Sequence, residues 1–379
     1  MNVFLLYRQY FDKVGKERKL GGIETYMDAL CTLFHKKKIV PIICQFADIL
    51  FERKYNGVVV KGYPVDNIQK LYGCIEKDVD KNADLILFMT DALSFKLTDV
   101  RSMSIQHGVA WDIPYSGRTL LRNSIGRLRY SWYGLRDFLY CDSSVCVDYN
   151  FYNWYKAIYP NSNRKRICVI PNFARQILTD FEVEQKIAGF GNKTIRVIFA
   201  RRFEEFRGSI LFARVMRTLL EKYPRLEVTI AGEGPCEEDM RQILADYSNR
   251  VTITKYLPSE AFCVHKEHDI AVVPTIGSEG TSLSLIEAMA AGCLAVSTPV
   301  GGMSNIIIDG YNGLYSMPEE EEMTSVIEKA VQMIEAGDGS LVRRAVETIR
   351  VGFGIDSWER KWSIFLDSLF LGNACNGKK

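Results

Sequence analysis

Short apolar runs alternate with longer segments of helical periodicity along most of the chain. In the first half, a helix is expected over residues 24–34, and the expected strands cover residues 2–6, 40–45, 84–88, 103–106, 144–147 and 167–170. Each of these strand-like runs is too short to form a buried helix. A second series of strands covers residues 195–200, 227–231, 251–255, 270–274 and 294–297, with helices over 209–222, 237–247 and 283–291. Such alternation is typical of parallel sheets wound through βα units, so the pattern predicts an α/β fold.

The chain is long enough for two domains. With 379 residues, it exceeds the length at which one hydrophobic core keeps growing. The segment 172–192 is polar and irregular and follows Pro171, so the hinge is expected there. We therefore predict an N-terminal domain over residues 1–172 and a second α/β domain over residues 173–352. The cleft between two such domains is the expected ligand site.

Composition narrows the class of protein. Hydrophobic residues make up 47% and charged residues 25% of the chain, as in ordinary globular proteins. The 48 basic and 46 acidic residues nearly cancel, which argues against a protein that works by coating nucleic acid. Ten cysteines without a Cys-x-x-Cys pair indicate free thiols in a reducing compartment. Since no run approaches the roughly 18 apolar residues of a membrane span, we expect a cytoplasmic protein, or one peripheral on the inner face of the cytoplasmic membrane.

The most informative segment joins a strand to a helix near residue 280. A polar loop carries Gly280, Thr281 and Ser282, and the helix is expected to start at Ser282 or Leu283. A glycine-bearing loop at a helix start presents free backbone N–H groups and the positive end of the helix dipole, which suits a phosphate. The hydroxyl groups of Thr281 and Ser282 could add donors. An ordinary helix N-cap explains the same residues without any ligand.

Two glutamates in this segment favour a ligand site over a simple cap. Glu287 lies about one turn inside the expected helix, where a carboxylate is a good bidentate acceptor for a ribose diol. Glu279 lies in the loop, with seven residues between it and Glu287, where it could accept hydrogen bonds from sugar hydroxyls. Together with the helix start, the two carboxylates indicate a site for a nucleotide sugar.

The sequence from Glu279 to Gly292 resembles the E-x7-E motif of family 4 glycosyltransferases, which are retaining enzymes of the GT-B fold. Residues 299–302 and 309–313 are also similar to that family, and the similarity extends across nearly the whole chain. The resemblance implies two Rossmann-like, doubly wound domains that face each other across a cleft, with residues 353–379 forming a C-terminal helix that crosses back to the first domain. It also implies that Glu279 contacts the donor sugar and Glu287 the ribose.

A second block, residues 200–208, lies between a strand and a helix, at the strand end where α/β sheets collect ligands. The resemblance places an arginine directly after this strand and a lysine before the glycine, both neutralising the donor diphosphate. Arg201 matches the first position, and Arg207 stands where lysine is usual. That departure keeps the charge but changes the geometry, because a guanidinium is a planar fork and an ammonium a compact point. The alternative is a solvated loop in which Glu204 and Glu205 pair with the arginines.

Three further matches to the family fall on loops. Gly232 and Gly234 resemble its Gly-x-Gly-Pro turn beside the nucleotide base, although a plain tight turn explains them equally well. The absence of a third glycine weakens an NAD interpretation. Gly21 and Gly22 resemble the glycine loop that lies against the donor phosphate and the acceptor, or they form a flexible connector. His107 follows a strand and matches the family's histidine at the donor sugar, where it shapes the sugar pocket rather than transferring a proton.

No metal site and no other cofactor are expected. His265 and His268 lie three residues apart without a ligand set of zinc spacing. The triplet Asp78-Val79-Asp80 matches the Asp-x-Asp that binds a divalent metal in GT-A glycosyltransferases. It falls in the segment 72–81, which is expected to be helical and precedes a strand, so a solvated helix face is favoured.

The resemblance implies a metal-independent hexosyltransferase that moves a sugar from a UDP- or GDP-linked donor to a glycan or lipid-linked saccharide acceptor, in polysaccharide or lipopolysaccharide biosynthesis. Arg201, Arg207 and the helix start at Ser282 would stabilise the leaving diphosphate, because preorganised positive charge is usually the largest catalytic effect. Two alternatives keep the same phosphate site: a sugar-nucleotide epimerase of the same fold, and a non-catalytic nucleotide-sugar binding protein.

Residues 118–139 form a basic and aromatic amphipathic stretch, in which five arginines alternate with leucine, isoleucine, tyrosine, tryptophan and phenylalanine. A stretch of this kind can lie on an anionic membrane surface. The alternative is a helix packed on its own domain, with its arginines simply solvated. We expect a nucleotide-sugar donor and a saccharide acceptor as partners, an anionic membrane as a further candidate, and no nucleic acid.

Overall fold

The computed structural model describes residues 1–109, 120–158, 166–191, 194–277 and 279–371. The chain divides into two compact units, a first unit over Met1–His107 with Arg118–Ile170 and a second unit over Gly108–Gly117 with Pro171–Lys379. The assignment of residues 1–172 to the acceptor and 173–352 to the donor stays a prediction, as does the return of residues 353–379 to the first domain.

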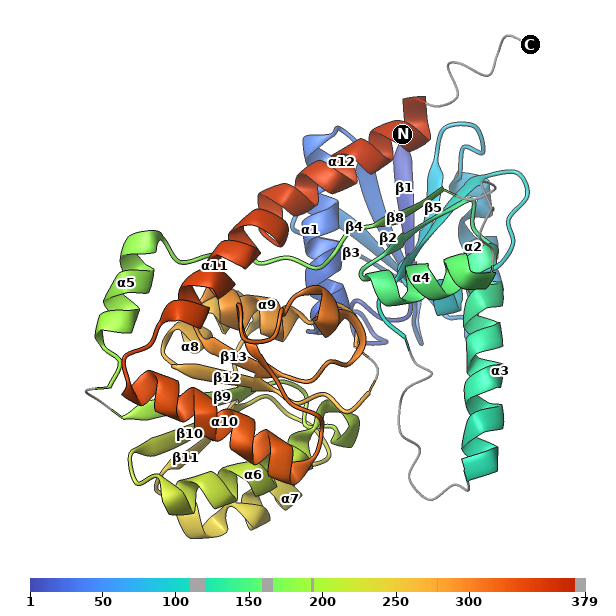
Figure 1. Ribbon diagram of the computed structural model, residues 1–379. Coiled ribbons are helices and arrows are strands. Elements are labelled where there is room, and N and C mark those ends of the chain that lie inside the picture. Colours follow the sequence, from blue (N-terminus) through green and yellow to red (C-terminus); the bar gives the residue numbers. More distant parts are fainter. Residues whose placement is uncertain (110–119, 159–165, 192–193, 278, 372–379) are drawn as a thin grey trace. The chain divides into compact units, whose positions relative to one another are not determined.

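The first unit is built on an eight-stranded sheet with the order β3-β4-β2-β1-β5-β6-β7-β8 (Figure 1). All its neighbouring strands are parallel except β3, which is antiparallel to β4. The strands are β1 (Asn2–Tyr7), β2 (Val40–Phe46), β3 (Phe51–Tyr55), β4 (Val58–Tyr63), β5 (Leu85–Phe88), β6 (Arg101–Gln106), β7 (Ser143–Cys146) and β8 (Arg166–Val169). The helices are α1 (Gly22–Lys36), α2 (Ile68–Ile75), α3 (Leu120–Leu139) and α4 (Tyr149–Ile158). Residues of β5 and β7 are buried throughout, as expected of central parallel strands.

The second unit is built on a six-stranded parallel sheet with the order β11-β10-β9-β12-β13-β14. Its strands are β9 (Ile195–Ala200), β10 (Leu226–Ala231), β11 (Val251–Thr254), β12 (Ile270–Val273), β13 (Leu294–Ser297) and β14 (Leu314–Tyr315). Counted within the unit, this is the 3-2-1-4-5-6 order of a doubly wound dinucleotide-binding sheet. The helices are α5 (Asp180–Ala188), α6 (Ser209–Lys222), α7 (Glu237–Ile243), α8 (Ala261–Lys266), α9 (Leu283–Ala290), α10 (Glu320–Glu335), α11 (Ser340–Gly352) and α12 (Ile355–Leu371).

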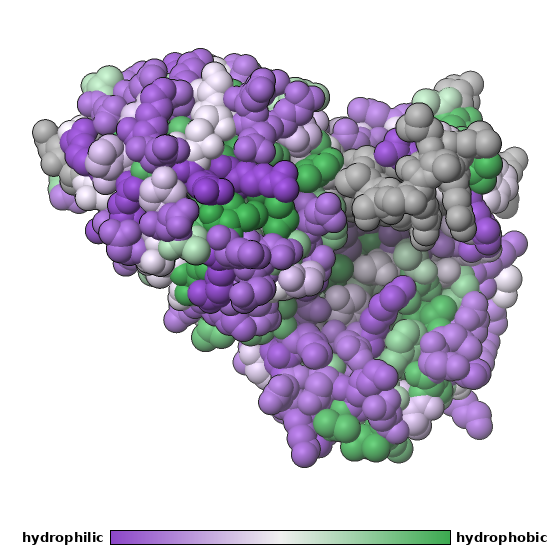
Figure 2. All heavy atoms as spheres, turned by 90° about the horizontal axis from the view of Figure 1, so that it is seen from below, coloured by the Kyte–Doolittle hydropathy of each residue, from purple (hydrophilic) through white to green (hydrophobic). Residues whose placement is uncertain are grey.

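Helices cover both faces of the second sheet because its strands are apolar on both sides. On β9, Val197 and Phe199 belong to the core formed with α6 and α10. The alternate residues Ile198 and Ala200 pack with Ala288 of α9 on the opposite face. This period of two is the pattern of a strand buried on both faces. The predicted α/β, doubly wound fold class is confirmed. The face of the molecule in Figure 2 is largely hydrophilic, with scattered hydrophobic areas.

The β3–β4 hairpin was not expected from the apolar pattern. Its turn is Asn56-Gly57, and both residues have positive φ angles, 48° and 80°. Asn-Gly is the preferred pair for such a two-residue hairpin turn, because both central residues must adopt left-handed backbone conformations. The dipeptide was therefore the available signal, although the polar strand Phe51–Tyr55 gives only a weak strand pattern of its own.

The expectation of an irregular segment over residues 172–192 is wrong, because α5 lies within it. A reciprocal capping box starts this helix: the Thr179 hydroxyl accepts the backbone N–H of Glu182 at 3.3 Å, and the Glu182 carboxylate accepts the N–H of Thr179 at 2.9 Å. This pattern satisfies two of the otherwise unpaired N–H groups of a helix start. The spacing Thr-x-x-Glu was visible in the sequence.

The helical segment expected over residues 72–81 is also shorter than predicted. Helix α2 ends at Ile75, a 3₁₀ turn covers Glu76–Asp78, and Val79 is extended. Asp78 and Asp80 therefore do not share a helix face. The Asp80 carboxylate accepts the backbone N–H groups of Asn82 and Ala83 at 3.0 and 3.3 Å, which is the role of an aspartate in a turn.

Candidate active site

The candidate site lies where the strand order of the second sheet reverses. Strand β9 is flanked by β10 on one side and β12 on the other, so the connections leaving β9 and β12 turn to opposite sides of this point. In open α/β sheets, ligands bind outside the carboxyl ends of the strands at such a switch point. Arg201 directly follows β9, and the loop after β12 carries Thr275 and Glu279. Three polar side chains thus meet at the expected position.

Glu279 is held between two arginines. One of its carboxylate oxygens, Oε2, forms ion pairs with both Arg201 and Arg207, and Arg201 also donates a hydrogen bond to the Thr275 hydroxyl. The exposed fractions of the side chains are 5% for Arg201, 11% for Glu279 and 25% for Arg207. Burial alone would raise the pKa of the Glu279 carboxyl, but the two guanidinium groups outweigh burial and hold that pKa below its ordinary value. The cluster is therefore charged at neutral pH, with two cations around one anion.

The loop that carries Arg207 is tied to the loop after β12. Arg207 ends a 3₁₀ turn, and the next residue, Gly208, has a φ of 81°. A side chain at Gly208 would run into the carbonyl group of Pro274. The Phe206 carbonyl accepts the N–H groups of Ile276 and Gly277 at 2.8 and 3.3 Å. These contacts fix Arg207 opposite the Glu279 loop, although the two residues are 72 positions apart.

The hydroxyl groups at the start of α9 have structural partners. Ser282 is the N-cap, and its hydroxyl accepts the N–H of Leu285 at 3.4 Å. The Thr281 hydroxyl accepts the backbone N–H of Asn172 at 2.9 Å, while the Asn172 amide donates to the Thr281 carbonyl. The ordinary-cap alternative therefore accounts for Ser282, whereas Thr281 joins its loop to Asn172. No acceptor for the backbone N–H groups of Ser282 and Leu283 is found within the described residues, so an anion can still bind to the backbone at this helix start.

Glu287 lies one turn inside α9 and is half-buried. Burial raises the pKa of its carboxyl to about 8, opposed only weakly by Arg175. In the described part of the chain, no group donates a hydrogen bond to this carboxyl. A half-buried carboxyl without a hydrogen-bond partner is a perturbed group of the kind that clusters at functional sites.

The sequence analysis missed two residues near Glu287. Tyr256 lies two residues after β11 and packs against the small cluster that includes Ala200 and Ala231. Burial and the nearby Glu287 raise the pKa of the Tyr256 hydroxyl. Arg175, the other missed residue, is exposed and lies over the ring of Phe173, 5.6 Å from its centroid. The position of Tyr256 close behind the carboxyl end of a strand was the signal that could have identified it.

Gly232 and Gly234 bring their loop against the segment that follows β9. A side chain at Gly232 would meet the Arg201 carbonyl, and one at Gly234 would lie 2.6 Å from the carbonyl oxygen of Phe203. The N–H of Phe203 donates to the Glu233 carbonyl at 2.9 Å. The two glycines, whose φ angles are 152° and 156°, thus permit the close approach that positions the Arg201 loop. Contact with a nucleotide base stays a prediction.

The remaining candidates, His107, Gly21 and Gly22, belong to the first unit. The His107 ring donates from Nε2 to the Met89 carbonyl at 2.9 Å and meets Tyr26 edge-on at 5.3 Å. Burial lowers the pKa of His107 to about 4, so the ring is neutral at physiological pH. Gly21 is the N-cap of α1 and Gly22 its first residue. The part of these three residues in a donor site stays a prediction.

The raised pKa of Glu287 predicts how stability depends on pH. Because the folded pKa of about 8 exceeds the ordinary value of 4.5, the folded protein keeps a proton that the unfolded chain releases. This contribution to stability is complete below the unfolded pKa and is lost as the pH rises towards 8. We therefore expect Glu287→Gln to gain stability relative to the unaltered protein between about pH 5 and pH 8. Denaturant unfolding over this range measures the difference, and a difference that does not change with pH would contradict the assignment.

Part of the second unit is similar to known proteins. Residues 194–336 match the family described as Glycosyl transferases group 1. A D-inositol 3-phosphate glycosyltransferase of Pseudarthrobacter chlorophenolicus is 30% identical over 128 residues, which are 32% of this chain and 30% of that protein. Matches to two further proteins of the same name cover 41% and 47% of their lengths, so the chain spans less than half of these curated relatives.

Solved structures match over nearly the whole chain. The sucrose-phosphate synthase of Thermosynechococcus elongatus superposes with a TM-score of 0.70 at 16% identity, covering 98% of this chain and 99% of that one. A TarM mutant from S. aureus, solved with fondaparinux, alpha-GlcNAc-glycerol and UDP, gives a TM-score of 0.72 at 13% identity, with coverages of 97% and 100%. At such identities these likenesses show the fold. Residues 194–336 are therefore similar to the glycosyl transferases group 1 family, and they lie in a chain of the GT-B fold.

Proposed function

We propose that this protein is a retaining glycosyltransferase that moves a hexose from a UDP- or GDP-linked donor to a hydroxyl group of a glycan or lipid-linked saccharide. The observation that supports it most strongly is the cluster of Arg201, Arg207 and Glu279 at the switch point of a group 1 glycosyltransferase domain. The TarM structure of the same fold contains UDP, which is consistent with a nucleotide at this position. A role in cell-surface polysaccharide synthesis is part of the proposal.

In this proposal, the donor diphosphate binds between Arg201, Arg207 and the start of α9. Two guanidinium groups and the backbone N–H groups of Ser282 and Leu283 would face the negative charge that develops on the leaving diphosphate. Because these groups are already in place, little reorganisation is needed when the bond to the sugar breaks. The positive charge of these groups would neutralise the leaving diphosphate in place of a divalent metal ion, so we expect sugar transfer without a metal.

The two glutamates would hold the parts of the donor on either side of the diphosphate. The Glu287 carboxyl accepts no hydrogen bond from the described residues and would bind the ribose diol. Glu279 would bind hydroxyl groups of the sugar. We assign no protein nucleophile, and the leaving phosphate would help to deprotonate the acceptor hydroxyl. Retention of the anomeric configuration rests on the resemblance of the segment from Glu279 to Glu287 to the E-x7-E motif.

Helix α3 supports an anionic membrane surface as a partner in this reaction. Three of its apolar side chains are strongly exposed, Ile125 at 59%, Leu128 at 72% and Trp132 at 65%, and their spacing places them on one face. Leu135 and Phe138 are buried, so the helix also packs on its own unit. No helix in the described ranges is both long and apolar enough to cross a membrane. Exposed apolar side chains among arginines favour binding along a lipid surface.

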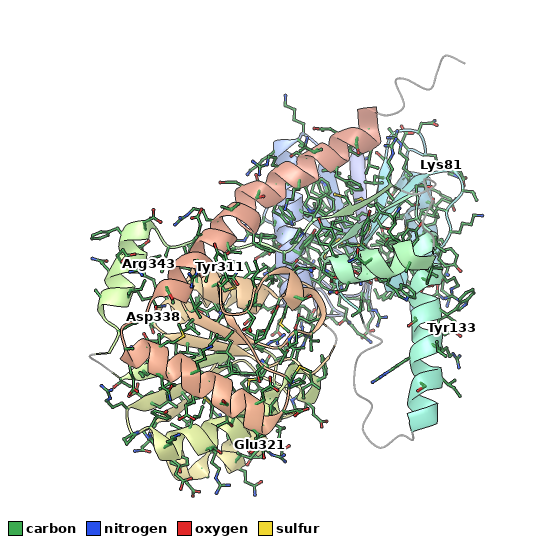
Figure 3. The ribbon with its side chains drawn as sticks, viewed as in Figure 1. Lys81, Tyr133, Tyr311, Glu321, Asp338 and Arg343 are labelled. Carbon is green, nitrogen blue, oxygen red and sulfur yellow. The ribbon has the colours of Figure 1, made fainter. Side chains whose placement is uncertain are left out.

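The positive charge on α3 is arranged around an aromatic residue. The guanidinium groups of Arg129 and Arg136 lie 5.3 and 4.8 Å from the ring centroid of Tyr133, which is labelled in Figure 3. Arg129 also donates a hydrogen bond to the Tyr133 hydroxyl at 3.1 Å. Both arginines and Arg127 are exposed. Such groups attract anionic lipids, each contributing about 1 kcal/mol near the surface.

Vesicle flotation checks this part of the proposal. We expect the protein to float with vesicles that contain anionic lipid and to remain below with neutral vesicles. Replacing Leu128 and Trp132 together by serine is expected to weaken binding at least about tenfold, because two large apolar anchors are lost. Phe181→Ser removes an exposed aromatic side chain from α5 and serves as the matched control. Equal flotation of both variants, or no flotation of the unaltered protein, would contradict a lipid-binding face on α3.

A screen of nucleotide sugars tests the proposed activity. Thermal unfolding of the whole protein is followed with UDP- and GDP-linked hexoses, and a compound that raises the melting temperature is then offered with a panel of saccharide acceptors. We expect nucleoside diphosphate to be released in step with a glycosylated product of retained anomeric configuration. A changed sugar formed without any acceptor would indicate an epimerase instead, and tight donor binding without turnover a binding protein.

A further inference from the structure

The pairing of Glu279 raises a question that donor binding alone does not answer. If Arg201 and Arg207 bind the diphosphate and Glu279 binds the sugar, the three side chains must point at different parts of one ligand. In the structure they instead contact one another, and both guanidinium groups share the single oxygen Oε2. The carboxylate thus occupies the position between the two cations.

Burial explains why the arginines need this partner. Arg201 is almost completely buried, and its remaining side-chain contact is to the uncharged Thr275 hydroxyl. A buried cation without a counter-charge costs several kcal/mol. Arg207 adds a second positive charge to the same place, and the start of α9 contributes its positive dipole end. Without Glu279, the site would hold two cations and no anion.

We propose that Glu279 is an internal counter-anion, which takes the place of the diphosphate between Arg201 and Arg207 whenever no donor is bound. Binding of the donor moves its carboxylate from Arg201 and Arg207 to the sugar, and loss of the sugar lets it return. This inference rests on the proposed function and deepens it, because it assigns Glu279 a role in releasing the nucleoside diphosphate product. It makes the site favour a diphosphate that carries a hydroxylated sugar over a bare diphosphate.

The charges involved make the exchange favourable. A diphosphate carries more negative charge than one carboxylate and offers several oxygens, so it can engage both guanidinium groups at once. The displaced carboxylate remains in a largely buried place and therefore needs new hydrogen-bond donors. The hydroxyl groups of a donor sugar supply them. A nucleoside diphosphate without a sugar does not, so Glu279 competes with it for the arginines.

The backbone around Glu279 is fixed, so a movement of its carboxylate has to come from its side-chain torsions. The Glu279 carbonyl accepts the N–H of Gly302 at 3.2 Å, and Gly301 and Gly302 press against the backbone from Glu279 to Thr281. These contacts with Gly301 and Gly302 hold the backbone of the Glu279 loop in place. A change of side-chain rotamer is enough to carry the carboxylate away from Arg201 without moving the loop.

The test compares the affinities of a bare diphosphate and of a sugar-bearing one. The whole protein is titrated calorimetrically with UDP, with GDP and with the nucleotide sugar that gives the strongest thermal shift. Glu279→Gln keeps the shape of the side chain but removes its charge. We expect this variant to bind the nucleoside diphosphate at least about tenfold more tightly than the unaltered protein does. Its affinity for the nucleotide sugar should increase by a smaller factor.

A matched control separates this effect from net charge. Glu328→Gln removes one negative charge from the same unit, at a carboxylate that pairs with Lys222 and Tyr223. We expect it to leave both affinities unchanged. Glu279→Asp keeps the charge on a shorter side chain, so its affinity for the nucleoside diphosphate is expected to lie between those of Glu279→Gln and the unaltered protein. This variant keeps the test valid if Glu279→Gln unfolds.

The outcomes distinguish this inference from the proposed function. If the unaltered protein binds nucleotide sugars but Glu279→Gln binds nucleoside diphosphate equally or more weakly, the counter-anion role is wrong and the donor site stands. If the folded, unaltered protein binds neither nucleoside diphosphate nor nucleotide sugar, the proposed function itself fails. Tighter binding of the bare diphosphate by Glu279→Gln, together with slower sugar transfer, supports both.

Discussion

Arg201→Ala is expected to lower kcat/KM for sugar transfer by about 100- to 1000-fold. The side chain is almost fully buried at the end of β9 and directs one nitrogen to Glu279 and another to Thr275. Its charge therefore acts in a place from which water is largely excluded, where electrostatic stabilisation of a leaving group is strongest. Steady-state kinetics with the nucleotide sugar found in the donor screen measure the effect. The loss is expected in kcat more than in KM, because the charge on the diphosphate increases in the transition state.

Two further variants control for charge and for the strand itself. Arg196→Ala removes an exposed arginine from the same strand, where it pairs with Glu227 at 3.6 Å, and is expected to leave transfer unchanged. Arg201→Lys keeps the charge but cannot contact Glu279 and Thr275 as a planar fork, so partial activity is expected. If Arg201→Ala retained activity within about threefold of the unaltered protein, the diphosphate could not depend on this residue.

Gly302→Ala is expected to damage both the fold and the site. An added side-chain carbon would overlap the backbone of Gly280 and Thr281, where the neighbours are main-chain atoms that cannot rotate away. The N–H of Gly302 also donates to the Glu279 carbonyl at 3.2 Å. Overpacking against main-chain atoms is one of the strongly destabilising kinds of substitution, so we expect the free energy of unfolding to fall by about 2 to 4 kcal/mol. Donor affinity should fall as well, because the same contact positions the Glu279 loop.

Denaturant unfolding and donor titration measure the two effects. Gly352→Ala is the matched control, because a side chain at the end of α11 would meet nothing within 4 Å. We expect that control to unfold at the same denaturant concentration as the unaltered protein or at a slightly higher one. A Gly302→Ala protein of normal stability and normal donor affinity would show that the contact beneath Glu279 is unimportant.

The central elements of the second unit could be predicted from the sequence because several signals agreed there. The strands Ile195–Ala200 and Leu294–Ser297 and the helix Ser209–Lys222 were predicted to the residue. Continuous apolar runs mark strands that are buried on both faces, and a regular helical period marks the helix between them. Strand β3 was missed because it is polar and lies at the sheet edge, where packing imposes little pattern. In β4, the apolar run of residues 58–60 was the available signal.

The candidate site was only partly predictable. Arg201 and Glu279 were identifiable from their places after strands, but their ion pair joins residues 78 positions apart. A pairing over that distance depends on which strands become neighbours, and the apolar pattern does not specify strand order. The hydroxyl oxygens of Thr281 and Ser282 accept the backbone N–H groups of Asn172 and Leu285, and donation by these hydroxyls to a ligand stays a prediction. Local sequence cannot distinguish a cap from a ligand contact, because both use the same atoms.

The most direct test of the account is a calorimetric titration of the whole protein with the nucleotide sugar from the donor screen, in buffer that contains EDTA. We expect saturable binding of one donor per chain, and EDTA should leave this binding unchanged. The binding should be clearly weakened in Glu287→Ala, because the ribose loses its carboxyl acceptor. A strict requirement for a divalent metal, or equal donor affinity in the Glu287→Ala variant, would contradict it.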